Sequence, residues 1–132
     1  MKIRKRRESD IYISISKLMA LQHPNIVYRF DFAAGMKMTI GQGRLHKSMN
    51  GFVGYPDLFI AYPNGKYSGL YLEIKLEGKK VFKKDGSLLM DEHLERQQKI
   101  LKMLSAAGYY ATFAIGIHES LIIIDKYIKN EL

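Results

Sequence analysis

Apolar residues recur along the chain at two spacings, one typical of helices and the other of strands. Over residues 6–22 the apolar positions follow the i, i+4, i+7, i+8 spacing of a helix with one buried face. The end of this element is indicated by His23-Pro24, because a residue before proline is pushed out of the helical region. We therefore predict a helix over 6–22, although its first half also alternates as a strand does. The predicted buried face comprises Ile11, Ile15, Leu18 and Met19.

Three segments have the length and the β-branched or aromatic content of strands, namely residues 25–32, 55–62 and 69–76. Pro63-Asn64-Gly65 separates the last two and has the chemistry of a tight turn, which predicts an antiparallel hairpin. A fourth segment, 109–116, is almost wholly apolar and is suited to burial on both faces of a sheet.

The remaining chain divides into loop and helix. Residues 33–54 contain five glycines, which predicts a loop with at most a short helix. Helical periodicity returns over 91–107, ending at Gly108, and over 119–129. The predicted order is α-β-β-β-α-β-α, an α/β sandwich around a central mixed sheet. With no repeat or linker, residues 1–132 are expected to form one domain that carries a basic arm at 1–7.

Charge is the first indication of a partner. The chain carries 21 Lys and Arg against 13 Asp and Glu, a net charge of +8. The basic residues gather in two clusters, the N-terminal arm and the segment 79–84, a pattern that favours a nucleic acid over a neutral partner. There is no cysteine, which excludes disulfides, thiolate metal sites and a cysteine nucleophile. The basic start is followed by Glu8, Ser9 and Asp10 instead of the apolar core of a signal peptide, and no apolar stretch reaches the length of a membrane span, so we expect a cytoplasmic protein.

The residues suited to catalysis lie on the predicted hairpin. Successive side chains of a strand alternate between its faces, so Glu73 and Lys75 share one face while Ile74 turns into the core. Asp57 begins the preceding strand and is expected to converge on the same face. Paired carboxylates are hard ligands for Mg²⁺ or Mn²⁺, and the backbone carbonyl of Ile74 lies where it can complete the ligand set. A lysine beside them can position or activate water, which predicts metal-assisted phosphodiester hydrolysis. The alternative is an ordinary cross-strand ion pair on a half-exposed hairpin.

These motifs resemble the PD-(D/E)xK nuclease superfamily and, within it, the virus-type replication-repair nuclease (VRR-NUC) family. Gly54-Tyr-Pro-Asp57 is similar to that family's Gly-x-Pro-Asp, and Glu73-Ile-Lys75 to its Glu-x-Lys. Gln97, on a helix that ends at Ala106-Ala-Gly-Tyr109, resembles its Gln-bearing helix. Two departures stand out: Leu76-Glu-Gly78 replaces the usual glycine directly after Glu-x-Lys, and a lysine-rich insertion precedes the glutamine helix.

The resemblance implies a restriction-endonuclease-like fold and assigns roles to further residues. It implies that Asp57, Glu73 and the Ile74 carbonyl bind the metal, and that Lys75 and Gln97 join the two acids in catalysis. Glu8 is the natural match to the family's acidic residue on the first helix, a further metal ligand; the alternative is an acid that stabilises the helix N-terminus. Gln97 is alternatively a polar residue at the rim of the core. Glu77 also falls on the Glu73 face, where it would add charge or pair with Lys75.

DNA contacts are expected from exposed basic residues. Arg44 and Lys47, in the glycine-rich loop, and Lys79 and Lys80, after the hairpin, are placed to hold phosphates without reading sequence. The four histidines lack metal-ligand spacing and are treated as structural or surface residues.

What the resemblance implies for function is a Mg²⁺-dependent or Mn²⁺-dependent, structure-selective DNA endonuclease. Stand-alone members of this size resemble bacterial or phage proteins that act as homodimers on branched DNA such as four-way junctions, and related domains belong to DNA repair enzymes. Two-fold symmetry would pair two active sites with two strands of a junction. The competing hypothesis is a non-catalytic DNA-binding or phage-assembly module with the same fold, in which the carboxylates form ion pairs.

Overall fold

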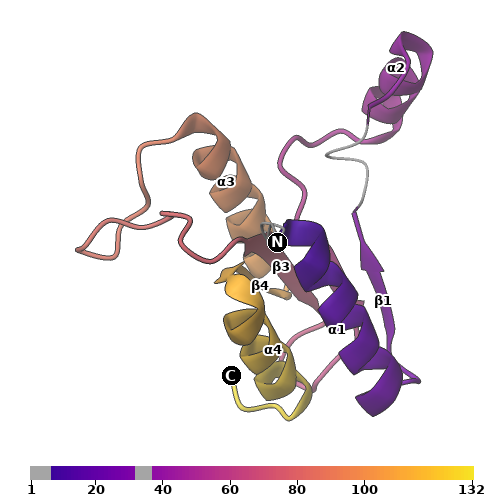
Figure 1. Ribbon diagram of the computed structural model, residues 1–132, viewed down its shortest axis with the longest axis vertical. Coiled ribbons are helices and arrows are strands. Elements are labelled where there is room, and N and C mark those ends of the chain that lie inside the picture. The colour runs from indigo at the N-terminus through magenta and orange to yellow at the C-terminus, as the bar shows by residue number, and fades with distance from the viewer. Residues whose placement is uncertain (1–6, 32–36) are drawn as a thin grey trace, which may run out of the picture.

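The structure, a computed structural model, describes residues 7–31 and 37–132, and this part of the chain forms one four-stranded mixed sheet with helices on both of its faces (Figure 1). This arrangement confirms the expected α/β class. The elements in chain order are α1 (Glu8–Gln22), β1 (Val27–Phe30), α2 (Ile40–Met49), β2 (Leu58–Ala61), β3 (Leu70–Lys75), α3 (Glu92–Ala106), β4 (Tyr110–Ile115) and α4 (Gly116–Ile128).

The strands lie in the order β1-β2-β3-β4, with the first two pairs antiparallel and β3-β4 parallel. The predicted hairpin is therefore confirmed, and Pro63-Asn64-Gly65 lies in its connection. The β2-β3 register ends at the pair Leu58 and Leu72, so the last residues of β3 extend beyond β2. The residue before β2, Asp57, lies beside this extension.

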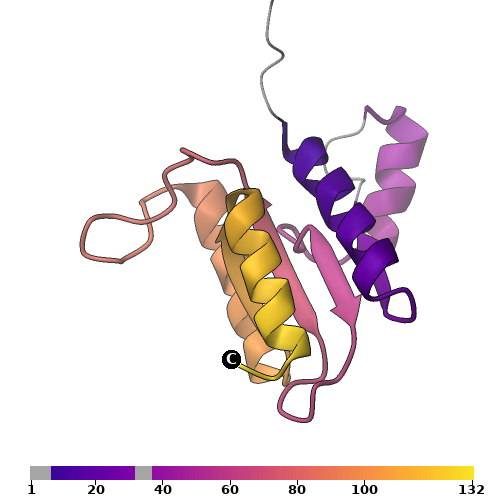
Figure 2. The same ribbon diagram turned by 60° about the horizontal axis from the view of Figure 1, so that its bottom comes forward.

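Helices α1 and α4 cover one face of the sheet, and α3 covers the opposite face over β3 and β4 (Figure 2). The larger core lies under α1 and α4 and contains Ile11, Ile15, Met19, Leu58, Ile60, Leu70, Leu72, Ile74, Ala114, Ile124 and Tyr127. A smaller core under α3 contains Val81, Leu94, Leu101 and Phe113. The spacing along the first predicted helix is borne out at Ile11, Ile15 and Met19, which are buried.

Burial is complete along β3 and partial along β4. All six residues of β3 are buried, whereas in β4 only Phe113 and Ala114 are. The expectation that 109–116 is buried on both faces holds at these two residues, since Phe113 lies under α3 and Ala114 on the opposite face. The rest of β4 is half-exposed, because β4 forms an edge of the described sheet. The polar residues of β3 are consequently held in the interior.

The glycine-rich segment departs furthest from its prediction. Its glycines predict a loop with at most a short helix, and it contains the ten-residue helix α2, so the order in the described chain is α-β-α-β-β-α-β-α. Thr39 begins this helix with a capping box, because its hydroxyl accepts from Gln42 N and the Gln42 side chain accepts from Thr39 N. No residue of α2 is buried, and the helix stands away from the sheet (Figure 1).

The start of the last helix also differs from the prediction. Helix α4 begins at Gly116, three residues earlier than expected, and the Glu119 carboxylate accepts from Ile115 N at its start. The N-terminal arm lies outside the described residues except for Arg7. In the part of the chain that the structure describes, no helix has both the length and the apolar character needed to cross a bilayer.

Candidate active site

The end of β3 presents an acid and a base on the sheet face that α3 covers. Glu73 and Lys75 lie on this face because strand side chains alternate, while Ile74 between them is fully buried in the larger core. Lys75 Nζ lies 3.4 Å from Glu73 Oε1, and both residues are buried, with 6% and 3% of their surface exposed. This burial excludes the half-exposed ion pair considered from sequence.

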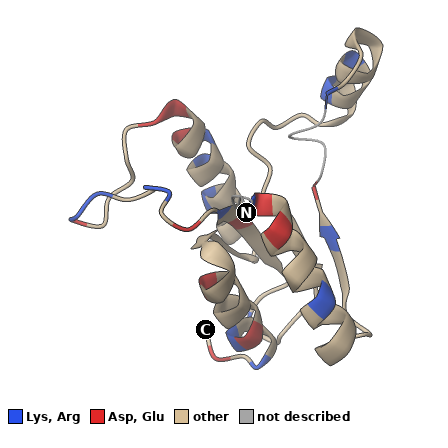
Figure 3. Cartoon of the chain, viewed as in Figure 1, with Lys and Arg blue, Asp and Glu red and all other residues tan. Residues whose placement is uncertain are grey.

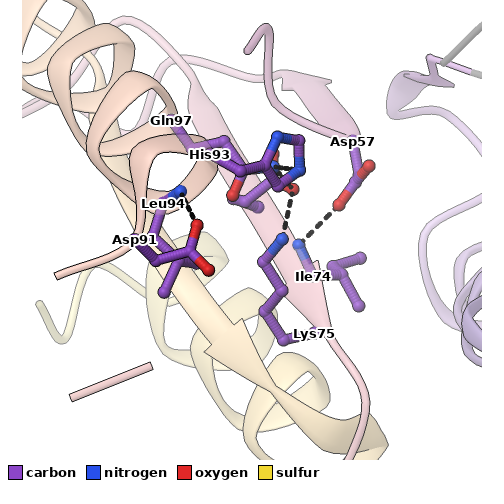
Figure 4. A network of polar contacts seen from close by, with 8 residues as sticks. Asp57, Ile74, Lys75, Asp91, His93, Leu94 and Gln97 are labelled. Carbon is purple, nitrogen blue, oxygen red and sulfur yellow. Dashed lines mark hydrogen bonds and ion pairs between the residues drawn. The ribbon is translucent and has the colours of Figure 1, made fainter. Parts of the chain in front are cut away.

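Asp57 reaches the same site from the start of β2. Its Oδ2 accepts a hydrogen bond from Ile74 N at 2.7 Å (Figure 4). This bond takes the place of a strand-to-strand bond where β2 has ended. The N–H and C=O of a strand residue face the same neighbour in an antiparallel pair, so the Ile74 carbonyl points toward the side where Asp57 lies. The structure thus brings Asp57, Glu73, Lys75 and the Ile74 carbonyl together.

Helix α3 contributes Gln97, which is buried against the site. Gln97 Nε2 donates to Glu73 Oε1 at 2.8 Å and fixes the orientation of that carboxylate. The close approach of α3 depends on Gly54, whose φ of +93° is a conformation that other residues rarely adopt. A Cβ built on Gly54 would lie 3.3 Å from the backbone of Arg96 and Gln97. The first glycine of the Gly-x-Pro-Asp motif therefore allows Gln97 to reach Glu73.

His93 is a site residue that sequence reasoning missed. It lies one helical turn before Gln97, and His93 Nε2 is 3.2 Å from Gln97 Nε2 (Figure 4). The interpretation of all four histidines as structural or surface residues is therefore incomplete. The available signal was the i, i+4 spacing between His93 and Gln97 on a predicted helix.

Helix α1 brings two more side chains to Asp57. Burial and then the charge of Asp57 raise the pKa of Glu8, while Lys75 lowers it, which places Glu8 within electrostatic reach of the site. One turn later, the Tyr12 hydroxyl donates a hydrogen bond to the Asp57 carboxylate. The Tyr12 ring stacks on Phe30 with the ring centres 4.7 Å apart. Sequence analysis proposed Glu8 but not Tyr12, although the i, i+4 spacing from Glu8 was visible.

Ionising both the buried Glu73 and the half-buried Asp57 carboxyl groups is energetically unfavourable. Burial, followed by the charge of Asp57, raises the pKa of Glu73 to about 9, and burial also raises the pKa of Asp57. Glu73 Oε2 is buried, and no N–H or O–H group of residues 7–31 and 37–132 donates to it. Its acidic neighbour is Asp57, with which it can share a hydrogen bond only while one of them holds a proton. The site thus needs a proton or a cation between the acids in addition to Lys75.

A divalent cation fits this donor set. Mg²⁺ is commonly bound by one or two carboxylates and keeps several waters, so two acids and a carbonyl are sufficient. The unsatisfied Glu73 Oε2 is a hard oxygen that a cation would satisfy. Among residues 7–31 and 37–132, no group of three Asp, Glu or His side chains is arranged to hold a metal ion. Glu8 lies within electrostatic reach of Asp57, and its role as a further ligand stays a prediction.

The residues expected to contact DNA lie at different distances from the site. Lys79 and Lys80 are exposed in the turn after β3, and Lys79 interacts electrostatically with Glu8. Arg44 and Lys47 are exposed on α2 rather than in a loop, because residues 40–49 are helical. Figure 3 shows basic residues on α2 and along the segment that follows β3.

Glu77 lies closer to α4 than sequence reasoning suggested. Its Oε1 accepts from Ile117 N at 3.4 Å, and its side chain contacts Gly116, where a Cβ would lie 2.4 Å from Glu77 Cγ. The Glu77 carboxylate is thus directed to the first turn of α4, where a negative charge is favourable.

Comparison with known proteins gives one line of support for this fold. No family model and no curated protein matches the sequence. A solved structure named "VRR_NUC domain protein" is similar, with a TM-score of 0.68 and 24% sequence identity over 96% of this chain and 92% of that chain. The similarity extends over nearly all of both chains, so it concerns the whole domain. The chain therefore has a VRR-NUC-like fold, as the motifs around Asp57, Glu73 and Gln97 predicted.

Proposed function

We propose that the protein is a metal-dependent DNA endonuclease of the VRR-NUC type, which hydrolyses phosphodiester bonds. The observation that carries this proposal is the meeting of Asp57, Glu73 and Lys75 at one site, where the Asp57 and Glu73 carboxyl groups face each other beside a single lysine. Two carboxyl groups in contact need a proton or a cation between them, which a simple acid-lysine ion pair does not. A nucleophilic water and a phosphate group both need positive charge at this point, which the acids can recruit as a cation.

Asp57 and Glu73 would hold the cation, with the Ile74 carbonyl as a further ligand. When bound, a divalent cation lowers the pKa of a water and offsets the charge that develops on the phosphate under attack. Gln97 holds Glu73 in one orientation through its 2.8 Å hydrogen bond, and Ile74 N does the same for Asp57. Glu8 adds negative charge at the edge of the site.

Lys75 supplies the fixed positive charge of the site. Its ammonium lies 3.4 Å from Glu73 and is buried, so water does not screen it as it would at the surface. From this position Lys75 can donate hydrogen bonds to the attacking water or to a phosphate oxygen. These donors stabilise negative charge in the transition state more than in the bound substrate, which is the requirement for a catalytic group.

The DNA would be held by exposed lysines and arginines around this site. Lys79 and Lys80 lie next to it, and Arg44 and Lys47 extend the basic surface along α2. Contacts of this kind bind phosphates irrespective of sequence, which suits an enzyme that selects branched DNA such as four-way junctions by shape. The proposal includes Mg²⁺ or Mn²⁺ as the metal, a homodimer as the active unit, and the cytoplasm of a bacterial or phage-infected cell.

The decisive experiment is a cleavage assay with labelled four-way junction, flap, duplex and single-stranded DNA in Mg²⁺ or Mn²⁺. We expect cleavage by the wild-type protein and its loss in Asp57→Ala and Lys75→Ala. Matched controls are Asp125→Ala and Lys129→Ala, which break an exposed acid-lysine pair at the C-terminal end of α4. No cleavage of any substrate, or equal cleavage by all four variants, would reject the proposal.

A non-catalytic DNA-binding or phage-assembly module is the second candidate. It is favoured by the lack of a three-residue metal-ligating group in the described ranges. In that case the protein would bind DNA with a steep dependence on salt but take up no divalent cation. Calorimetric titration with Mn²⁺ separates the candidates, because only the nuclease predicts saturable binding that Asp57→Ala abolishes.

A further inference from the structure

Four aromatic side chains form a cluster on the sheet face that carries Glu73 and Lys75. Phe59 and Tyr71 are stacked, with ring centres 4.5 Å apart and planes inclined by 19°. Tyr55 and Tyr109 each meet Tyr71 edge to face, at 5.7 Å and 5.2 Å. The Tyr55 hydroxyl donates to the Tyr71 hydroxyl at 3.2 Å. We call these four residues the aromatic platform.

The aromatic platform continues directly into the candidate active site. Tyr71, Glu73 and Lys75 alternate along β3 and so point to the same face. Tyr71 and Glu73 are separated by two strand rises, about 6.6 Å, which is about two nucleotides of a stacked DNA strand. Tyr55 lies two residues before Asp57 on the segment that enters β2. A strand of DNA bound at Asp57 and Glu73 would therefore pass over or beside these rings.

The platform is open on the side of β1. Helix α3 covers β3 and β4, whereas on β1 the residues that share the platform face, Val27 and Arg29, are exposed. Arg29 is directly opposite Phe59 in the β1-β2 register, so its side chain is on the same face. Tyr55 is 43% exposed at the other end of the cluster. The cluster thus has a cation beside Phe59 and an accessible ring at Tyr55, and cations with aromatic rings are the groups that hold phosphates and bases of unpaired nucleic acid.

The ring arrangement is fixed by the backbone around it. Gly69 leaves the space that the rings occupy: a Cβ there would be 2.9 Å from the Phe59 ring and 3.2 Å from the Tyr109 ring. Tyr71 in the centre is only 7% exposed, so it serves as the base on which the outer rings rest. Rings held in this way lose little conformational freedom when a base stacks on them, which favours binding.

We propose that the aromatic platform binds an unpaired nucleobase of the DNA strand that enters the active site, with Tyr55 as the accessible stacking ring and Arg29 as a phosphate contact. This subsite rests on the proposed nuclease function and gives a reason for a preference for branched substrates, because a branch point supplies unpaired bases beside duplex. Stacking is tolerant of base identity, so the subsite selects unpaired structure rather than sequence.

The test uses DNA with one unpaired 2-aminopurine at a branch, compared with the same probe inside a duplex, in EDTA so that no strand is cut. The chain contains no tryptophan, so the probe's fluorescence is read without that background. We expect wild-type protein to quench the unpaired probe. Tyr55→Leu should remove the quenching and weaken binding of the branched DNA by about tenfold, the order expected for one stacked base. Binding of duplex should be unchanged.

Tyr55→Phe is the matched control, because it keeps the ring and loses only the hydroxyl that contacts Tyr71; it should quench as the wild type does. Equal behaviour of Tyr55→Leu and wild type would overturn the proposal. An equal loss of duplex and branched binding by a Tyr55→Leu protein that keeps the wild-type circular dichroism spectrum would also overturn it, since Tyr55 would then contact DNA irrespective of unpaired bases. Light scattering that shows a change of oligomeric state in Tyr55→Leu would instead assign the face to a second copy of the chain, which rejects the subsite.

Failure of this proposal and failure of the nuclease proposal give different results. Quenching that depends on Tyr55, without cleavage in Mg²⁺ or Mn²⁺, would retain the subsite and reject the nuclease. Cleavage that depends on Asp57 and Lys75, without any dependence on Tyr55, would do the reverse.

Discussion

Replacing Glu73 with glutamine should stabilise the metal-free protein at neutral pH while abolishing cleavage. The pKa of Glu73 is raised from 4.5 to about 9 in the folded chain, so between these values the folded protein holds a proton that the unfolded chain has lost. The stability that depends on this proton is complete below pH 4.5 and declines as pH rises toward 9. Glutamine needs no proton, because its amide can donate toward Asp57 and its oxygen can accept from Gln97.

The magnitude follows from linkage. Each pH unit in this window costs about 1.4 kcal/mol, so the wild type should lose ~3 kcal/mol of unfolding free energy between about pH 5 and pH 7.5 relative to Glu73→Gln. Burial raises the pKa of Asp57 and of Glu8 as well, and both acids remain in the variant. Because Asp57 and Glu73 share a hydrogen bond, the difference between the two proteins measures Glu73 together with its effect on Asp57.

Urea unfolding followed by circular dichroism, in EDTA at the two pH values, measures this difference. Adding Mn²⁺ at about 100 times its dissociation constant should then raise the wild-type stability at the higher pH by about 2.7 kcal/mol and leave Glu73→Gln nearly unchanged. If the unfolding free energy of the two proteins depends on pH in the same way, the reasoning is refuted, because burial would then not raise the pKa of Glu73. A stabilising effect of Mn²⁺ that is equal in both proteins would remove Glu73 from the cation site.

Three further variants test separate parts of the site. Lys75→Met should keep DNA affinity within about threefold while cleavage falls by about 100-fold or more, measured as single-turnover rates, because one fixed donor to the transition state is lost. The double variant Lys79→Ala, Lys80→Ala should reduce the salt dependence of duplex binding by about 1.8 in log-log slope if each lysine contacts one phosphate; an unchanged slope would place the DNA elsewhere. Gly54→Ala should cost about 1–3 kcal/mol in thermal unfolding and slow cleavage, because φ of +93° is strained for alanine and its Cβ would push against the backbone at Gln97.

Much of the candidate site was predictable because it depends on local pattern. Alternation along a strand is enough to place Glu73 and Lys75 on one face, and the turn at Pro63-Asn64-Gly65 is enough to bring the start of β2 beside the end of β3. The approach of Asp57 follows from these two facts. The helix that carries Gln97 was visible in its apolar periodicity and in the glycine that ends it.

Other features depend on the packing of elements that are distant in sequence. Tyr12 and His93 join the site because α1 and α3 converge on it. Their i, i+4 spacings to Glu8 and Gln97 show that each pair shares a helix face, but not that both faces meet at Asp57 and Glu73. The near-complete burial of β3 arises because it is flanked by β2 and β4 and covered by helices on both sides, whereas the more apolar β4 has a strand on one side only. The exposure of a strand therefore depends on the strands and helices packed against it, and its hydropathy alone does not predict it.

The amino-acid order therefore determined which elements form, which side chains share a face and which acids and base meet at the hairpin. Only the tertiary structure decided how deeply that meeting point is buried. Burial of Glu73 raises its pKa and keeps water away from its second carboxyl oxygen. Water is excluded there because strands and helices from distant parts of the sequence pack around the site, and no single segment can do this.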